Sequence, residues 1–304
     1  YLNGGLFERD AWDAREDVSV PDAVFPAILD DLLYRYNFTV TESTPLDVEV
    51  AVDPEMLGKI FEELVTGRHE SGSYYTPKPI VAFMCRAALK GYLRDACSQE
   101  TAAALAAFVN ARDPGDIRAP ERVLAALKQV RACDLACGSG AYLLGMLHEL
   151  LELRSALFAT RGLDPQTAYE HKLEIIQNNL YGVDLDPFAV NIARLRLWLS
   201  LIVDYEADAE RPPPPLPNLD FKIEVGDSLT APAPEQLQPD LFHHQLVQRY
   251  LQLKGEFMTA HGPEKRKLRE KIAEVQQQIA EWAGTAGDPG FFYNEAEIAE
   301  IYTA

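Results

Sequence analysis

Three acidic residues follow short apolar runs, in a pattern that suggests a shared binding site. Asp134, Asp184 and Asp227 lie at or just after the ends of RACDL (131–135), LYGVD (180–184) and FKIEV (221–225). A single aspartate after a strand is most often a turn or cap residue. Three at successive strand ends predict a ligand site, because open α/β sheets bind ligands at the carboxyl ends of their strands.

A glycine-rich turn, DLACGSG (134–140), follows the first of these acids. Gly138 and Gly140 allow the backbone to approach a ligand and to turn into a helix. A dinucleotide site would place a third glycine or alanine at Leu143 and an acid roughly 20 residues further on, whereas Asp184 is much more distant. No Gly-Lys-Ser/Thr follows, as a P-loop would require. The turn therefore favours neither a phosphate nor a nicotinamide dinucleotide.

The second and third acids could hold different parts of one ligand. A carboxylate at the position of Asp184 can accept hydrogen bonds from two ribose hydroxyls, and Asp227 can accept one from an adenine amino group. Asp186 precedes Pro187 and is expected to cap the helix that follows.

The segment ESGSYYTPKPIVAFM (70–84) carries a further candidate. Thr76 precedes Pro77 and an amphipathic helix. One interpretation is an ordinary capped helix start, and the other is a helix N-terminus whose amides and threonine hydroxyl meet a ligand carboxylate. Tyr75 either lines the mouth of such a site or packs in the core.

The elements that must position these residues form an α/β pattern over 131–230. Strands are expected near 131–135, 180–184 and 221–225, with helices over 140–158 and 187–204. This alternation predicts a parallel sheet with helices on its faces.

Helical patterns flank this core. Residues 1–70 are predicted to form an acidic helical region with helices over 22–36 and 53–65, and 71–130 a helical segment broken around 113–115. After a proline-rich connector (211–217), residues 231–304 contain a predicted antiparallel hairpin with a coiled-coil seam and a turn at 261–263. The apolar seam positions are Phe242, Leu246, Tyr250, Leu253, Phe257, Leu268, Ile272, Val275, Ile279 and Trp282.

Composition limits the class of protein. The chain has 304 residues, is 47% hydrophobic and contains no apolar run of the roughly 20 residues that a membrane span needs. Its four cysteines form no Cys-x-x-Cys pair, which favours reduced thiols in a cytoplasmic protein. No set of residues has the spacing of metal ligands, so no metal site is expected. Because Tyr1 is not an initiator methionine, we expect the chain to be part of a longer protein.

The charge distribution argues against nucleic acid as the main partner of most of the chain. The net charge is −19, and residues 1–70 carry 16 acids against five bases. KRKLREK (265–271) is the most basic stretch. It is either a solvated helix face or a contact to DNA phosphate.

Taken in order, SGSYYTP, DLACGSG, YGVDLDP and GDSL resemble the first motifs of S-adenosylmethionine-dependent N6-adenine DNA methyltransferases. The resemblance extends over nearly the whole chain, since YLNGGLFE, DPEMLGKIFEEL and the hairpin also resemble large type IIG restriction-modification enzymes. It implies a Rossmann-like methyltransferase sheet, an N-terminal helical region and an inserted helical hairpin.

The resemblance also implies roles for single residues. In the Tyr75-Thr76-Pro77 motif, Thr76 would bind the methionine carboxylate of the cofactor. Asp134 and the backbone of Ala136, Gly138 and Gly140 would cradle the methionine. Asp184 would hold the ribose, Leu185 would pack on the adenine and Asp227 would meet its amino group. The family often has an aromatic residue where Ser228 stands.

The catalytic Asn-Pro-Pro-Tyr motif of the family does not occur in residues 1–304. In the family this motif holds a flipped adenine and aligns its amino group for attack on the sulfonium methyl. We therefore expect no catalytic residue in this chain, a parent enzyme of a restriction-modification or related phage-defence system, and DNA contacts mainly outside the chain.

Two other functions stay open on the sequence. A methyltransferase of the same class can act on RNA or on a protein glutamine. A non-catalytic domain could bind the cofactor or serve as a scaffold. A dinucleotide-dependent oxidoreductase is disfavoured by Leu143 and by the distance along the chain from Gly138 to Asp184.

Overall fold

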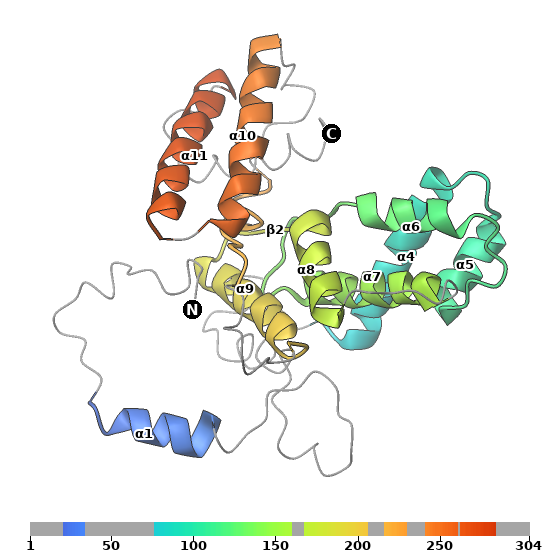
Figure 1. Ribbon diagram of the computed structural model, residues 1–304, viewed down its shortest axis with the longest axis horizontal. Helices are drawn as coiled ribbons and strands as arrows, with labels where there is room; N and C mark the ends of the chain where they lie inside the picture. Colours follow the sequence, from blue (N-terminus) through green and yellow to red (C-terminus); the bar gives the residue numbers. More distant parts are fainter. Residues whose placement is uncertain are drawn as a thin grey trace.

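A small parallel sheet lies near the centre of the described part of the chain (Figure 1). The computed structural model describes residues 21–33, 76–159, 167–205, 216–229, 241–260 and 262–283. Within them the strands are β1 (Ala132–Asp134), β2 (Leu180–Asp184) and β3 (Ile223–Val225), in the order β1-β2-β3. The strands lie where the sequence predicted them, and the parallel pairing is confirmed.

Helices complete the crossovers between the strands. α7 (Ala141–Ala159) and α8 (Ala168–Asn179) connect β1 to β2, and α9 (Pro187–Ile202) connects β2 to β3. The predicted capping role of Asp186 is confirmed, since its Oδ1 accepts a hydrogen bond from the Phe188 N–H at 2.9 Å.

The sequence analysis did not predict α8. Thr167 and Glu170 form a capping box at its start, and this pattern could have revealed it.

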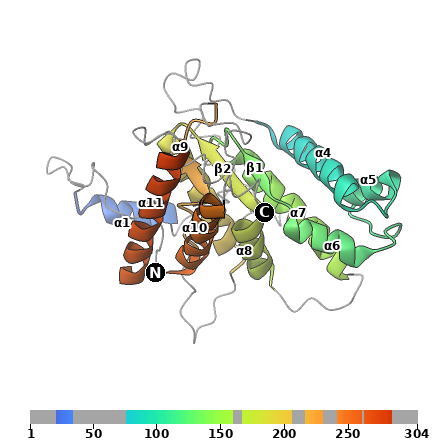
Figure 2. The same ribbon diagram turned by 90° about the horizontal axis from the view of Figure 1, so that it is seen from above.

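One apolar core joins these helices to one face of the sheet. Leu143, Leu147 and Leu150 of α7 belong to it together with Leu197 of α9 and Ile223 of β3. α4 (Lys78–Ala96), α5 (Ala102–Ala111) and α6 (Pro120–Gln129) extend this core along α7, as Figure 2 shows. The predicted break around 113–115 is confirmed.

The last two described helices, α10 (Leu241–Thr259) and α11 (Gly262–Ala283), lie side by side (Figures 1 and 2). Their shared core is built from predicted seam positions together with Phe221 and Ala260. The members from the seam are Tyr250, Leu253, Phe257, Leu268, Ile272, Val275 and Ile279, with Leu246 packed beside them. Lys254 of α10 lies over the ring of Tyr181 in β2, at 5.5 Å from its centroid, so α10 approaches the face of the sheet opposite α7 and α9.

The N-terminal region is described only over 21–33. There the predicted helix 22–36 appears as α1 (Val24–Ile28) followed by the π-helix η2 (Leu29–Leu33). The predicted helix 53–65, most of the proline-rich connector, and the side chains of Phe242 and Trp282 lie outside the described residues.

The cysteines are free thiols. Cys85, Cys97 and Cys137 are buried, and Cys133 is half-buried. Burial raises the pKa of Cys85 to about 12 and also raises the pKa of Cys137, so both stay protonated at neutral pH. No helix in the described ranges has the length and apolar character needed to cross a membrane.

Candidate functional site

The parallel register brings the three acids to the same edge of the sheet. Asp134 and Asp184 are the last residues of β1 and β2, and Asp227 follows β3 by two residues. Gly182 in β2 pairs with Asp134, and Val225 in β3 pairs with Asp184. The expected convergence of the acids is therefore present.

Each acid also forms the local turn that its residue type favours. The Oδ1 atom of Asp134 accepts a hydrogen bond from the Ala136 N–H at 3.2 Å. Asp184 and Asp227 repeat the arrangement with the N–H groups of Asp186 and Leu229, both at 3.0 Å. The turn role and a ligand role are thus compatible, because each side chain uses one oxygen for the turn.

The second oxygens distinguish Asp134 from Asp184. Asp134 Oδ2 is buried and has no hydrogen-bond partner within the described part of the chain. Burial raises the pKa of Asp134, and the nearby charge of Asp184 adds to the increase. Asp184 Oδ2 instead accepts a hydrogen bond from the Gly138 N–H at 2.7 Å and so ties the end of β2 to the glycine-rich turn.

The two glycines of the turn are needed for different structural reasons. Both adopt positive φ, +51° at Gly138 and +84° at Gly140. A Cβ on Gly140 would lie 3.0 Å from Ala193 Cβ, so this glycine permits close packing of α9. Within the described part of the chain, a Cβ on Gly138 would have no heavy atom within 4 Å. Of these two glycines, Gly138 is thus the one that faces space among the described residues.

The sequence analysis missed Arg196 and Gly182, which support this turn. Arg196 of α9 is buried, and its Nη1 donates to the carbonyl oxygen of Ser139 at 2.6 Å and to its Oγ at 3.0 Å. Arg196 and Ser139 are 57 residues apart in the sequence, so no local pattern predicts their contact. A Cβ on Gly182 would lie 2.9 Å from Leu143 Cδ1. A glycine inside a strand is the signal that could have identified this close approach.

Exposed leucines accompany the acids. Leu135, Leu185 and Leu229 are 53%, 71% and 96% exposed, and each follows one of the acids by one or two residues. The Ser228 hydroxyl donates to the Leu135 carbonyl at 2.7 Å and links the turns after β3 and β1. All three leucines are therefore accessible to solvent at the edge of the sheet that bears the acids.

Thr76 precedes α4 and lines a cavity beside the start of α7. Pro77 is the N-cap of α4, and no side chain of the described residues caps this helix, so these residues do not support the capped-start interpretation. Thr76 is half-buried and lines a cavity of about 350 Å³ that Ala141 and Arg196 also line. The cavity thus places Thr76 near the helix start that follows Gly140, but none of the three acids lines it. Tyr75 lies outside the described residues.

No cluster of three or more His, Cys, Asp or Glu side chains within the described ranges could hold a metal ion. The site's polar groups are carboxylates and backbone amides, which suit a ligand with hydroxyl, amino or ammonium groups.

Comparisons with known proteins point to one class. Residues 112–230 match the family model of the MmeI DNA-methyltransferase domain, and 178–291 match that of the Eco57I restriction-modification methylase. Both matches include Asp184 and Asp227, and the first also includes Asp134. The chain is similar to restriction-modification methyltransferases.

Two curated relatives agree with this similarity. A protein of Methanocaldococcus jannaschii, named as a type II restriction enzyme and methyltransferase, is 30% identical over 91% of this chain. DNA methyltransferase A of Bacillus subtilis is 23% identical over 49% of it. The chain spans only 25% and 16% of the lengths of these relatives.

Proposed function

We propose that this chain is the cofactor-binding part of a DNA methyltransferase that transfers a methyl group from S-adenosylmethionine to N6 of a flipped adenine, in a restriction-modification or related phage-defence system. The main support is that three carboxylates lie at the same edge of the sheet as the open turn at Gly138. The chain is also similar to restriction-modification methylases. A cytoplasmic location accords with this role.

The residues present fit the methionine end of this cofactor. A buried carboxylate oxygen without a partner is costly unless a ligand completes its hydrogen bonding. The cofactor's ammonium would supply a charged donor to Asp134 Oδ2. Ala136, Gly138 and Gly140 would contribute backbone to this cradle. Thr76 would bind the carboxylate beside the start of α7.

The adenosine end would lie over the ends of β2 and β3. Asp184 uses one hydrogen bond at each oxygen, and each carboxylate oxygen has a second lone pair. It could therefore accept both ribose hydroxyls without releasing Gly138. Leu185 would pack on the adenine and Asp227 would accept from its amino group. Leu229 stands next to Ser228 and offers apolar surface that an aromatic residue otherwise provides.

When bound, S-adenosylmethionine supplies an electrophilic methyl group. The residues of this chain bind and orient it, and the acids and leucines fix the position of its sulfonium. The adenine-activating Asn-Pro-Pro-Tyr motif does not occur in residues 1–304. We therefore propose that the chain alone binds cofactor without turnover, and that a longer protein supplies the target-base pocket and the main DNA contacts.

Calorimetric titration of the chain with S-adenosylmethionine tests this proposal, with NADH as the ligand control. We expect binding of S-adenosylmethionine alone and at least a tenfold weaker affinity in Asp184→Ala. Asp116→Ala removes an exposed carboxylate outside the site and should bind like the wild type. Asp184→Asn, which keeps one acceptor oxygen, should also weaken binding if the ribose needs both.

Circular dichroism and thermal melting must show that each variant is folded. Tight binding of NADH would overturn the assignment of the ligand. Absence of S-adenosylmethionine binding by a folded wild-type chain would contradict the proposal that this chain itself holds the cofactor.

A further inference from the structure

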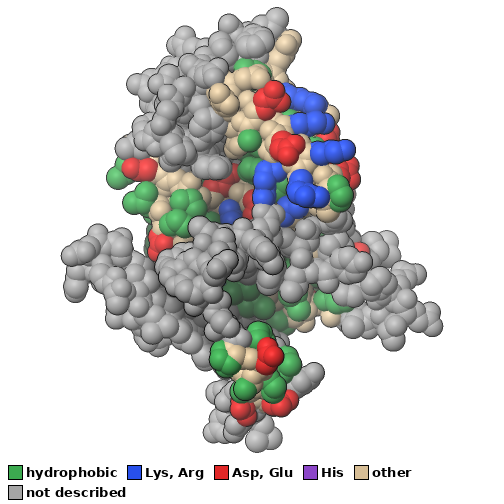
Figure 3. All heavy atoms as spheres, turned by 90° about the vertical axis from the view of Figure 1, so that its left-hand side faces the viewer, with side chains coloured by type: hydrophobic (Ala, Val, Ile, Leu, Met, Phe, Trp, Pro, Cys, Tyr) green, Lys and Arg blue, Asp and Glu red, His purple; other side chains and the backbone are tan. Residues whose placement is uncertain are grey.

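The hairpin of α10 and α11 differs in charge from the rest of the chain. Residues 241–283 carry seven lysines and arginines against five acids, although the whole chain has a net charge of −19. Figure 3 shows several Lys and Arg side chains on one side of the molecule, with Asp and Glu side chains among them. Arg266, Lys267 and Lys271 are exposed on α11, where Glu264, Glu270 and Glu274 are exposed as well. No ion pair within the described part of the chain neutralises these three.

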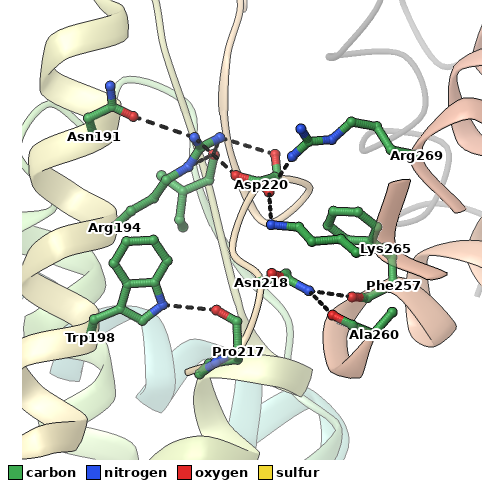
Figure 4. A network of polar contacts seen from close by, with 11 residues as sticks. Asn191, Arg194, Trp198, Pro217, Asn218, Asp220, Phe257, Ala260, Lys265 and Arg269 are labelled. Carbon is green, nitrogen blue, oxygen red and sulfur yellow. Dashed lines mark hydrogen bonds and ion pairs between the residues drawn. The ribbon is translucent and has the colours of Figure 1, made fainter. Parts of the chain in front are cut away.

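A second group of cations lies beside them at the turn end of the hairpin. Asp220 forms ion pairs with Arg194 at 3.5 Å, Lys265 at 3.7 Å and Arg269 at 2.9 Å (Figure 4). The Asp220 side chain is only 11% exposed, whereas that of Arg269 is 39% exposed. Asp220 thus holds Lys265 and Arg269 of α11 in place, and Arg269 is the one of these two that reaches the surface.

The hairpin presents its cations from a fixed position. The Asn218 Nδ2 donates to the carbonyl oxygens of Phe257 at 2.7 Å and Ala260 at 3.0 Å, which end α10 (Figure 4). The Trp198 Nε1 of α9 donates to the Pro217 carbonyl at 2.9 Å. These bonds attach the turn end of the hairpin to α9, so the cations lie on a rigid element and not on a flexible tail.

We propose that the basic face of α11, formed by Arg266, Lys267 and Lys271, contacts the phosphate backbone of double-stranded DNA. The inference rests on the proposed function for the identity of the polyanion. Phosphate contacts need exposed, unneutralised cations and carry no sequence information themselves. Asp220 precedes β3 and Asp227 follows it, so this contact would lie away from the cofactor site and should leave cofactor affinity unchanged.

The test is fluorescence anisotropy of the full 304-residue chain with a labelled duplex at several salt concentrations. Arg266→Gln, Lys267→Gln and Lys271→Gln are combined in one variant. Arg269 is left intact because it also binds Asp220. The matched control combines Arg94→Gln, Arg118→Gln and Arg122→Gln, exposed bases elsewhere that give the same change in net charge.

We expect the α11 variant to bind duplexes of unrelated sequence more weakly, by at least tenfold at low salt. The slope of log affinity against log salt should become shallower by roughly 2–3, because each lost phosphate contact contributes about 0.9. The control variant should keep the wild-type slope. Both should retain their S-adenosylmethionine affinity and thermal melting.

The outcomes separate the two proposals. If the wild type binds duplex and the α11 variant has the same slope as the wild type, the basic face is not the contact, and the proposed function is unaffected. If the wild type binds single-stranded RNA and not duplex, both the DNA partner and the proposed substrate are wrong. Loss of cofactor binding in the α11 variant would contradict a remote contact.

Discussion

At the scale of single residues, Asp134 shows how one side chain can serve both the fold and a ligand. Its Oδ1 completes the turn after β1, while its buried Oδ2 has no partner within the described ranges. The first role is needed in every state of the protein. The unpaired Oδ2 lowers the stability of the ligand-free protein, as is common where a binding site for a charged group is already formed.

Asp134→Asn is predicted to stabilise the ligand-free chain at pH 7 and to lower S-adenosylmethionine affinity at least tenfold. The pKa of Asp134 is raised in the folded state, so the stability that this shift confers is fully present below its ordinary value of 3.8. It is lost as the pH rises through the folded-state pKa. The uncharged asparagine does not lose stability as the pH rises, and it keeps an oxygen that can accept from the Ala136 N–H.

Urea unfolding of both proteins between pH 4 and pH 7 tests this prediction. The stability difference in favour of the variant should grow with pH. A wild type that is the more stable at pH 7 would show that the buried oxygen has a compensating partner.

At the scale of elements, the carboxyl end of α6 depends on residues far away in sequence. The Asn179 Nδ2 donates to the carbonyl oxygens of Leu127, Lys128 and Val130, at 3.4, 3.1 and 2.6 Å. The Arg154 Nη2 donates to Leu127 and to the Asn179 Oδ1, both at 2.7 Å. One buried amide thus joins the ends of α6 and α8 to α7, just before β1 and β2 begin.

Asn179→Ala is predicted to lower the free energy of unfolding by about 3 kcal/mol, because several buried carbonyl groups would lose their donor. Asn178→Ala changes the exposed neighbour on the same helix and should cost less than about 1 kcal/mol. Denaturant titration compares the two. Equal costs would mean that water or rearranged side chains replace the amide.

The elements that the sequence predicted are those with strong local patterns. The strands, α7, α9 and the seam of α10 and α11 have apolar periodicity or a proline next to a cap, so their types and approximate limits could be inferred. The meeting of Asp134, Asp184 and Asp227 followed from the rule for parallel sheets.

Other features depend on contacts between distant residues. The pairing of Arg196 with Ser139, the donors from Asn179 and the three cations around Asp220 each connect separate elements. α8 lacks a strong apolar pattern because polar residues such as His171 and Lys172 are buried in it. Tertiary packing decided these features, and local sequence did not.

At the scale of the whole molecule, the net charge of −19 means that added salt should change stability and DNA binding in opposite directions. We predict that the free energy of unfolding rises when salt increases from about 0.01 M to about 0.2 M. Salt shortens the screening length from ~30 Å to below 10 Å and weakens repulsion among the acids. The same change should weaken duplex binding.

Denaturant titrations at fixed pH across this salt range measure the effect on stability. A fall in stability with salt would indicate that ion pairs such as those at Asp220 and Glu149 outweigh the repulsion between the acids.

The attachment of the hairpin through Asn218 and Asp220 also gives the molecule a mechanical path. These residues lie within five positions of Ile223, where β3 begins, and Asp227 stands two residues beyond the end of that strand. A force applied to the far ends of α10 and α11 would be transmitted to the sheet through this short segment. Part of the load would reach β3, whose far end leads to the wall of the proposed adenine pocket.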